Sequence, residues 1–107
     1  MKHGWTLAAG VAAALSVSSP AGAAPAVHTI VIEGMRFLPP LAEVKAGDLV
    51  VWRNRDPFPH TVASGGPGFA SPPIPAQGSW RFRARKAGEY AYVCTLHPTM
   101  SGVLRVR

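Results

Sequence analysis

The sequence predicts a small all-β protein, an antiparallel β-sandwich, and three observations support that prediction. Apolar and polar residues alternate with a period of two in several short segments, as they do when one face of a strand is buried. Glycine and proline, 11 of each in 107 residues, separate these segments at short intervals. No segment repeats its apolar residues at the helical period of 3.6 over the length of a helix.

Five segments are predicted as strands. They are residues 27–32, 49–54, 80–83, 89–94 and 103–107. The first is rich in β-branched side chains, and the second follows the Gly47-Asp48 turn. Residues 80–83 and 103–107 alternate between apolar and polar residues, and residues 89–94 follow the Ala87-Gly88 turn. Residues 64–75 are predicted to form a surface loop, because their density of glycine and proline excludes a central strand.

The first 23 residues have the organisation of a secretory signal peptide. A basic start at Lys2 is followed by an uncharged apolar run over residues 7–17 and by the small residues Ala21-Gly22-Ala23. The alternative, a membrane anchor, is disfavoured because the run is far shorter than the roughly 20 residues that span a bilayer. We therefore expect cleavage after Ala23, export to the periplasm, and one mature domain over residues 24–107 without a membrane span.

Composition limits what this domain can be. It would have 84 residues, and the loss of Lys2 would lower the formal net charge from +6 to +5. The single cysteine, Cys94, excludes an internal disulfide and a four-cysteine zinc site. Small domains without disulfides often contain a metal. The arginines at 81, 83 and 85 share one strand face, which is more typical of a solvated surface than of a nucleic-acid site, so no nucleic-acid partner is expected.

Four residues together predict a metal site. Cys94, His97 and Met100 follow one another at intervals of three, directly after a predicted strand, and His60 ends another loop. A thiolate and a thioether are soft ligands that favour copper, and two histidines with one cysteine and a weak axial methionine form the type 1, or blue, copper site. Zinc is disfavoured because a methionine sulfur is a poor fourth ligand for it.

Each of these residues also has an ordinary alternative role. A lone cysteine is most often a small buried side chain, and a methionine near a strand usually fills the core. Cys94 could also be a nucleophile with His60 or His97 as its base, but no group that would orient the base stands out, and Met100 would have no role. The placement of three such residues within seven, with an upstream histidine, favours the metal site.

These motifs resemble those of cupredoxins, the small blue copper proteins of the amicyanin and plastocyanin type. Segments 35–39, 44–48, 51–56 and 88–94 follow the family pattern, as does Pro59-His60. The resemblance implies a Greek-key sandwich that binds one copper ion through His60, Cys94, His97 and Met100. It also implies a monomeric electron carrier rather than an enzyme. A periplasmic copper carrier or storage protein with the same ligands is the alternative.

The resemblance also implies how partners would bind. The edge of His97 would reach the surface inside an apolar collar, for which the candidates are Pro57, Phe58, Phe69, Leu96, Pro98 and Thr99. The partners would be redox proteins, such as a cytochrome, a dehydrogenase or an oxidase, and the positive charge would favour an acidic one. Thr61 stands where these families usually have an asparagine that ties the two ligand loops together.

Overall fold

Seven strands form in residues 24–107, the part of the chain that the computed structural model describes. They are β1 (Val27–Ile32), β2 (Phe37–Leu38), β3 (Leu41–Val44), β4 (Leu49–Asn54), β5 (Ser79–Arg83), β6 (Gly88–Cys94) and β7 (His97–Val106). The expected signal peptide, residues 1–23, lies outside the described part. Within the described part no helix is long and apolar enough to cross a membrane.

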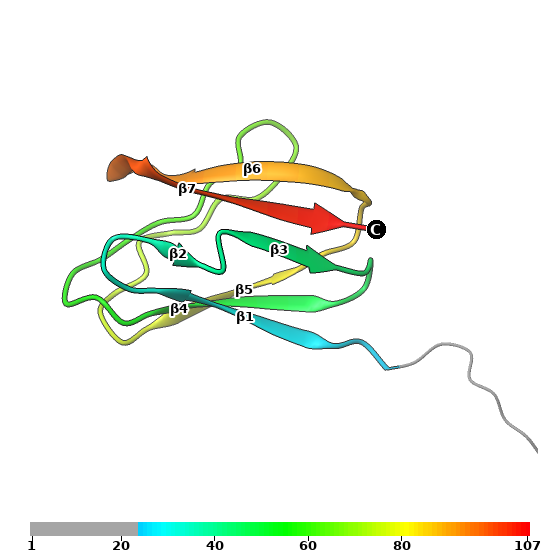
Figure 1. Ribbon diagram of the computed structural model, residues 1–107, viewed down its shortest axis with the longest axis horizontal. Helices are drawn as coiled ribbons and strands as arrows, with labels where there is room; N and C mark the ends of the chain where they lie inside the picture. Colours follow the sequence, from blue (N-terminus) through cyan, green and yellow to red (C-terminus); the bar gives the residue numbers. More distant parts are fainter. Residues whose placement is uncertain (1–23) are drawn as a thin grey trace, which may run out of the picture.

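The strands form two sheets that pack face to face (Figure 1). One sheet has the order β2-β1-β4-β5 and the other the order β3-β7-β6. The predicted all-β sandwich is confirmed, although its sheets are mixed, because β1 pairs with β4 and β3 with β7 in parallel. The remaining pairings, β1 with β2, β4 with β5 and β6 with β7, are antiparallel.

The predicted strands all exist, and two of them have the predicted bounds. These two are β1 and β4, whose burial alternates along the strand. The short strands β2 and β3 were not predicted, because prolines 39 and 40 interrupt the pattern between them. Strand β7 begins at His97 rather than at residue 103, so most of the expected loop after Cys94 is strand.

The core between the sheets is centred on Trp52 of β4. Its ring centroid lies 5.5 Å from that of Tyr92, 5.7 Å from that of Trp80 and 5.3 Å from that of Phe69. Phe69 is only 6% exposed, so its expected place in a surface collar around His97 is wrong. Its loop instead folds inward and supplies an aromatic ring to the core, where such rings contribute large buried areas.

A close packing contact holds β6 and β7 in register. Tyr92 lies opposite Gly102, and a Cβ atom at Gly102 would come within 2.5 Å of the Tyr92 hydroxyl oxygen. The aromatic ring therefore covers a position that only glycine can occupy without a shift of the ring. Between Val93 and Cys94 the register shifts, so that Cys94 lies opposite His97.

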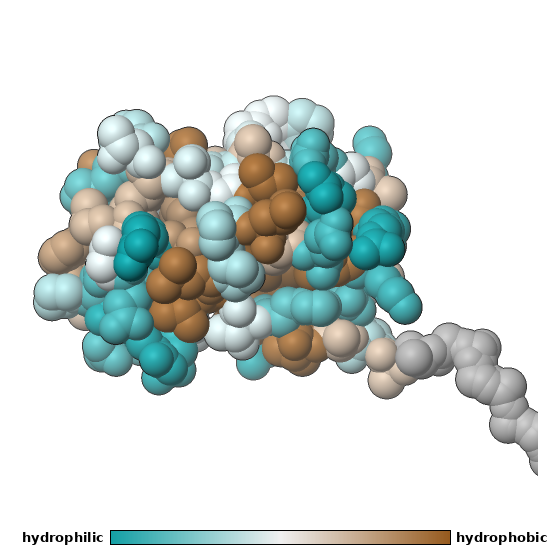
Figure 2. Space-filling model, viewed as in Figure 1, coloured by the Kyte–Doolittle hydropathy of each residue, from teal (hydrophilic) through white to brown (hydrophobic). Residues whose placement is uncertain are grey.

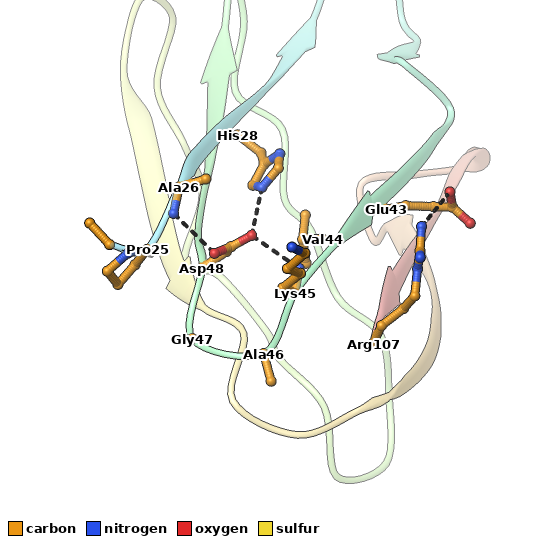
Figure 3. Close-up of a pocket in the computed structure, with 11 residues that line it drawn as sticks. Pro25, Ala26, His28, Glu43, Val44, Lys45, Ala46, Gly47, Asp48 and Arg107 are labelled. Carbon is orange, nitrogen blue, oxygen red and sulfur yellow. Dashed lines mark hydrogen bonds and ion pairs between the residues drawn. The ribbon is translucent and has the colours of Figure 1, made fainter. Parts of the chain in front are cut away.

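A buried carboxylate, Asp48, closes the end of the sandwich at which β4 begins (Figure 3). Its oxygens accept hydrogen bonds from the backbone N–H groups of Ala26 and Lys45, each at 3.0 Å, and lie 2.9 Å from His28 Nε2. These donors bring the pKa of Asp48 from its ordinary value of 3.8 down to about 2. Asp48 thus ties the start of β1 to the turn between β3 and β4.

The surface has no single broad apolar face in the view of Figure 2, where hydrophobic areas are broken by hydrophilic ones. The large hydrophobic side chains that remain exposed in residues 24–107 are Val27, Leu38, Leu41, Phe58 and Leu96. Two of them, Phe58 and Leu96, belong to the loops that carry the candidate metal ligands, and they are considered with that site.

Candidate metal centre

Three of the four predicted ligands converge at one end of the sandwich. The candidate donor atoms of His60, Cys94 and His97 all lie within 4.8 Å of one another. His60 Nδ1 is 3.7 Å and His97 Nδ1 is 3.9 Å from Cys94 Sγ. Two imidazole nitrogens therefore face one sulfur atom, as a metal ion between them requires.

A tight turn between β6 and β7 brings two of these residues together. Cys94 ends β6, His97 begins β7, and the two pair across a turn of only two residues, Thr95 and Leu96. The register between the strands shifts between Val93 and Cys94, because Val93 lies opposite Ser101 and Cys94 lies opposite His97. Irregularities of this kind re-aim side chains next to functional sites.

The third residue, His60, arrives from the other sheet. It lies beyond β4, is fully buried, and exchanges backbone hydrogen bonds with Ile74. Its Nε2 lies 2.8 Å from the Oδ2 of Asp56. Because the ionised carboxylate can only accept a hydrogen bond there, the imidazole carries its hydrogen on Nε2 and leaves the Nδ1 lone pair free toward Cys94.

Asp56 is itself held in place from the loop between β1 and β2. Its oxygens accept the backbone N–H groups of Gly34 at 2.7 Å and Met35 at 3.0 Å. Both donors have a positive φ, which turns their successive N–H groups toward one anion. Burial raises the pKa of Asp56, but the hydrogen bonds from Met35, Gly34 and His60 outweigh burial and bring the pKa below 3.8.

A buried asparagine supports the same loop. The side-chain amide of Asn54 donates to the carbonyl oxygens of Phe58 at 2.9 Å and Ile74 at 3.0 Å, and its Oδ1 accepts the N–H of Asp56 at 2.9 Å. Asn54 is fully buried, so these bonds replace the water that its amide would otherwise need. The amide fixes the segments on both sides of His60.

Thr61 ties the two ligand loops together. Its hydroxyl oxygen accepts the N–H of Thr95 at 2.8 Å and lies 2.8 Å from the Thr95 hydroxyl. The N–H of Thr61 donates to Cys94 Sγ at 3.4 Å. Thr61 therefore links the segment after His60 to the turn after Cys94, which is the link expected of the asparagine usual at this position.

The thiol of Cys94 is prepared for ionisation. Burial alone would raise its pKa, but the hydrogen bond from the Thr61 N–H and the imidazoles of His60 and His97 beside the sulfur lower it from 9.0 to about 6. A thiol with this pKa is mostly thiolate at neutral pH, and the thiolate is the form that binds metals.

The fourth predicted ligand, Met100, lies on β7 three residues after His97. It is 3% exposed and belongs to the core cluster. Thiolate and thioether sulfur with two imidazoles is a donor set suited to copper, so the residues present fit that metal. The part played by Met100 as an axial ligand stays a prediction.

One of the three converging residues reaches the surface. His97 is partly exposed, whereas His60 and Cys94 are fully buried. Phe58, 39% exposed, has its ring centroid 6.1 Å from that of His97, and Leu96 is 52% exposed. The expected apolar surroundings of His97 therefore exist at these two residues.

Sequence reasoning did not single out Asp56 or Asn54 as functional residues. Their signal was weak, because each acts through three or more hydrogen bonds that no residue spacing encodes. A carboxylate four residues before a candidate histidine ligand was the only hint.

A family model described as a cupredoxin-like domain matches residues 6–106. The chain belongs to this family. It is similar to amicyanin-alpha of Methylorubrum extorquens, with 36% identity over 85 residues, or 74% of this chain and 71% of that protein. It is also 36% identical over 76 residues to amicyanin of Paracoccus versutus, of whose length it spans only 58%.

Solved structures agree with this assignment. An oxidized amicyanin variant superposes with a TM-score of 0.71 at 32% identity and covers 76% of this chain and 82% of its own. A Cu(I) form of another amicyanin variant gives a TM-score of 0.70 at 30% identity, with the same coverage of the two chains. The cupredoxin fold predicted from the motifs is thus confirmed.

Proposed function

We propose that this protein is a periplasmic electron carrier with one type 1 copper ion, bound by His60, Cys94, His97 and Met100. The observation that carries the proposal is the convergence of two imidazole nitrogens on the Cys94 sulfur within 4.8 Å. When bound, copper supplies a one-electron couple. Residues 1–23 would be the signal peptide and residues 24–107 the mature monomeric domain.

Rigidity is what the protein contributes to electron transfer. The ligands are held by the Asp56 bond to His60, by the Thr61 link to the turn after Cys94, and by the short turn itself. Ligands fixed in one arrangement need little movement when the charge of the metal changes, which keeps the transfer fast. This constraint favours an electron carrier over a copper carrier, whose ligands must open to release their cargo.

The partly exposed His97 would be the route for electrons between copper and a partner. Phe58 and Leu96 beside it provide an apolar contact area of the kind that suits brief docking. The partner would be a redox protein, such as a cytochrome, a dehydrogenase or an oxidase. The formal net charge of +5 on residues 24–107 favours one with an acidic surface.

Addition of Cu(II) to the purified apo-protein tests the proposal. We expect an intense blue absorption band from charge transfer between the thiolate and copper, and we expect Cys94→Ser to abolish it. His28→Gln is the matched control, because His28 also bonds a buried carboxylate but lies at the other end of the sandwich. The control should keep the band.

Electron self-exchange distinguishes the two copper functions. A blue protein whose Cu(I) and Cu(II) forms exchange electrons rapidly supports an electron carrier. A colourless protein that retains copper only as Cu(I), and gives it up to a chelator without unfolding, would instead support copper transport or storage.

A further inference from the structure

A basic groove lies along β5, apart from the candidate metal ligands. It has a volume of about 410 Å³. Its lining residues are Pro67, Gly68, Arg81, Phe82, Arg83, Arg85, Lys86 and Tyr90. The four cationic side chains among them are exposed, and none of the five acidic residues of the chain lines the groove.

Four of the five acidic residues have other partners, and the fifth, Glu33, follows β1, which β4 separates from β5. Glu43 and Glu89 form ion pairs with Arg105, and Asp48 and Asp56 are buried at the two ends of β4. The guanidinium of Arg83 donates to the Gly47 carbonyl oxygen at 2.9 Å, which orients it without cancelling its charge. The groove therefore attracts anions.

The backbone of β5 is open on the same side. Strand β5 is the last strand of its sheet. Backbone hydrogen bonds join Asn54 to Gly78 and Asp48 to Ala84, at the two ends of the β4–β5 pairing. In an antiparallel pair every second residue bonds to the partner strand, so between these ends the even-numbered residues of β5 bond to β4. The N–H and C=O groups of Arg81 and Arg83 therefore point away from β4, toward the free edge.

We propose that this groove binds an extended acidic segment of a partner protein, which adds a strand to β5. The segment would pair with the free backbone groups of Arg81 and Arg83. Its residues on the same face, two apart along the strand, would place carboxylates against the two guanidinium groups. This surface goes beyond the proposed copper site, because no predicted ligand lines it.

A second copy of this chain does not fit as the occupant. Two β5 strands side by side would bring the arginines of one copy against those of the other, and like charges across a strand pair are destabilising. The same arginines that resist self-association thus favour an acidic segment. Single-stranded nucleic acid is disfavoured, because its stacking sites need exposed aromatic faces, whereas Phe82 and Tyr90 are only partly exposed and pack against the core.

The test measures peptide binding by the purified apo-protein, labelled with ¹⁵N. The probe is an acetylated peptide of four alternating glutamate–threonine pairs. We expect saturable amide shifts confined to the groove-lining residues and the rest of β5, and we expect added salt to weaken the binding. Shifts spread over the whole surface, or no saturable shift at millimolar peptide, would overturn the proposal.

Two controls separate a strand-binding groove from simple charge attraction. Arg81→Glu combined with Arg83→Glu should weaken binding by about tenfold or more, while the same charge change at exposed Arg36 and Lys45 should weaken it less than about threefold. A peptide of four glutamates followed by four threonines should bind more weakly than the alternating one. Equal losses in both double variants, or equal binding of both peptides, would contradict strand addition.

Folding of the variants is checked in the same spectra. If the double glutamate variant loses the dispersed spectrum of the folded protein, Arg81→Gln with Arg83→Gln replaces it and should also weaken binding. Because every measurement uses apo-protein, failure here leaves the copper proposal untouched, and the absence of a blue copper band would leave the groove untouched.

Discussion

Two buried carboxylates at opposite ends of β4 make almost the same contacts. Asp48 precedes the strand and Asp56 follows it. Each accepts two backbone N–H groups, and each lies within 2.9 Å of a histidine Nε2, from His28 in the first case and from His60 in the second. The two sites differ in the burial of the histidine and in the side chain that lies on the other side of its ring.

His60 is fully buried and turns its Nδ1 toward Cys94, whereas the side chain of His28 is 33% exposed and its residue belongs to no metal-binding cluster in residues 24–107. One arrangement, a carboxylate with two backbone donors and an imidazole, can thus serve either as a structural clamp or as support for a candidate metal ligand. The identity of the neighbouring side chain decides which.

The largest expected effect is a loss of copper affinity when Asp56, but not Asp48, is replaced. Asp56→Asn removes the charge that holds the Nε2 proton of His60, so the Nδ1 lone pair is less firmly directed toward the metal. We expect copper to bind about 10–100-fold more weakly. Competition with a chelator of known affinity measures this, and a blue band of altered energy would show that the change acts at the site.

Asp48→Asn is the matched control for that experiment. It removes the same charge from an equivalent set of donors at the other end, so copper affinity should stay within about twofold. Equal losses of copper affinity in the two variants would show that both carboxylates act only through the fold.

At Asp48 we expect a substitution to lower the stability of the apo-protein while leaving its copper affinity nearly unchanged. Asp48→Asn weakens the acceptor for the Ala26 and Lys45 N–H groups, and we expect the Tm of the apo-protein to fall by roughly 5 °C or more. His28→Gln should lower the Tm by less, because it removes only one of the three contacts. Calorimetry checks both, and an unchanged Tm in Asp48→Asn would refute the clamp.

The stability of the apo-protein at acid pH also tests whether the ionised Asp48 carboxylate stabilises the fold. The folded-state pKa of Asp48 is about 2 against an ordinary value of 3.8. Its stabilising contribution is therefore complete above pH 3.8 and is lost as the pH falls through 2. Urea unfolding of the apo-proteins measures this effect. The difference in the free energy of unfolding between wild type and Asp48→Asn should become smaller as the pH falls from 3.8 to 2. A difference that stays constant would mean that the carboxylate does not titrate as its contacts indicate.

The smallest expected effect concerns the extra tie at the metal end. Thr61→Val keeps the shape of the side chain but leaves the Thr95 N–H without its 2.8 Å acceptor. We expect a loss of about 1 kcal/mol in the free energy of unfolding and faster hydrogen exchange at the Thr95 amide. Thr99→Val, at an exposed position, is the control and should change neither.

How far the fold was predictable depends on the length of each pattern. Strands β1 and β4 were predicted to their bounds, because each has six residues rich in strand-forming side chains, and β4 follows a clear Gly47-Asp48 turn. Strands β2 and β3, with two and four residues, are too short for a period to show. The parallel pairings could not be predicted either, since they depend on which sheet each strand joins and not on any local pattern.

In the candidate site, too, some features could be predicted from the sequence and others could not. The positions of Cys94 and His97 were predictable, because donor residues three apart after a strand can meet across a turn. The inward fold of Phe69 was not, because glycine and proline density indicates a loop but not the direction in which its side chains point. Thr61 was noted only as a departure from the family pattern, and its hydrogen bonds to the Thr95 turn depend on a side-chain geometry that sequence does not record.

The candidate ligands come from both sheets, since His60 follows β4 whereas Cys94 and His97 lie on β6 and β7. A metal ion held by all three would act as a crosslink between the sheets, which no disulfide supplies because the chain has a single cysteine. By mass action, free copper at 100 times its dissociation constant would add about 2.7 kcal/mol to the stability of the folded state. The supply of copper would then help to decide how long this small domain survives proteolysis.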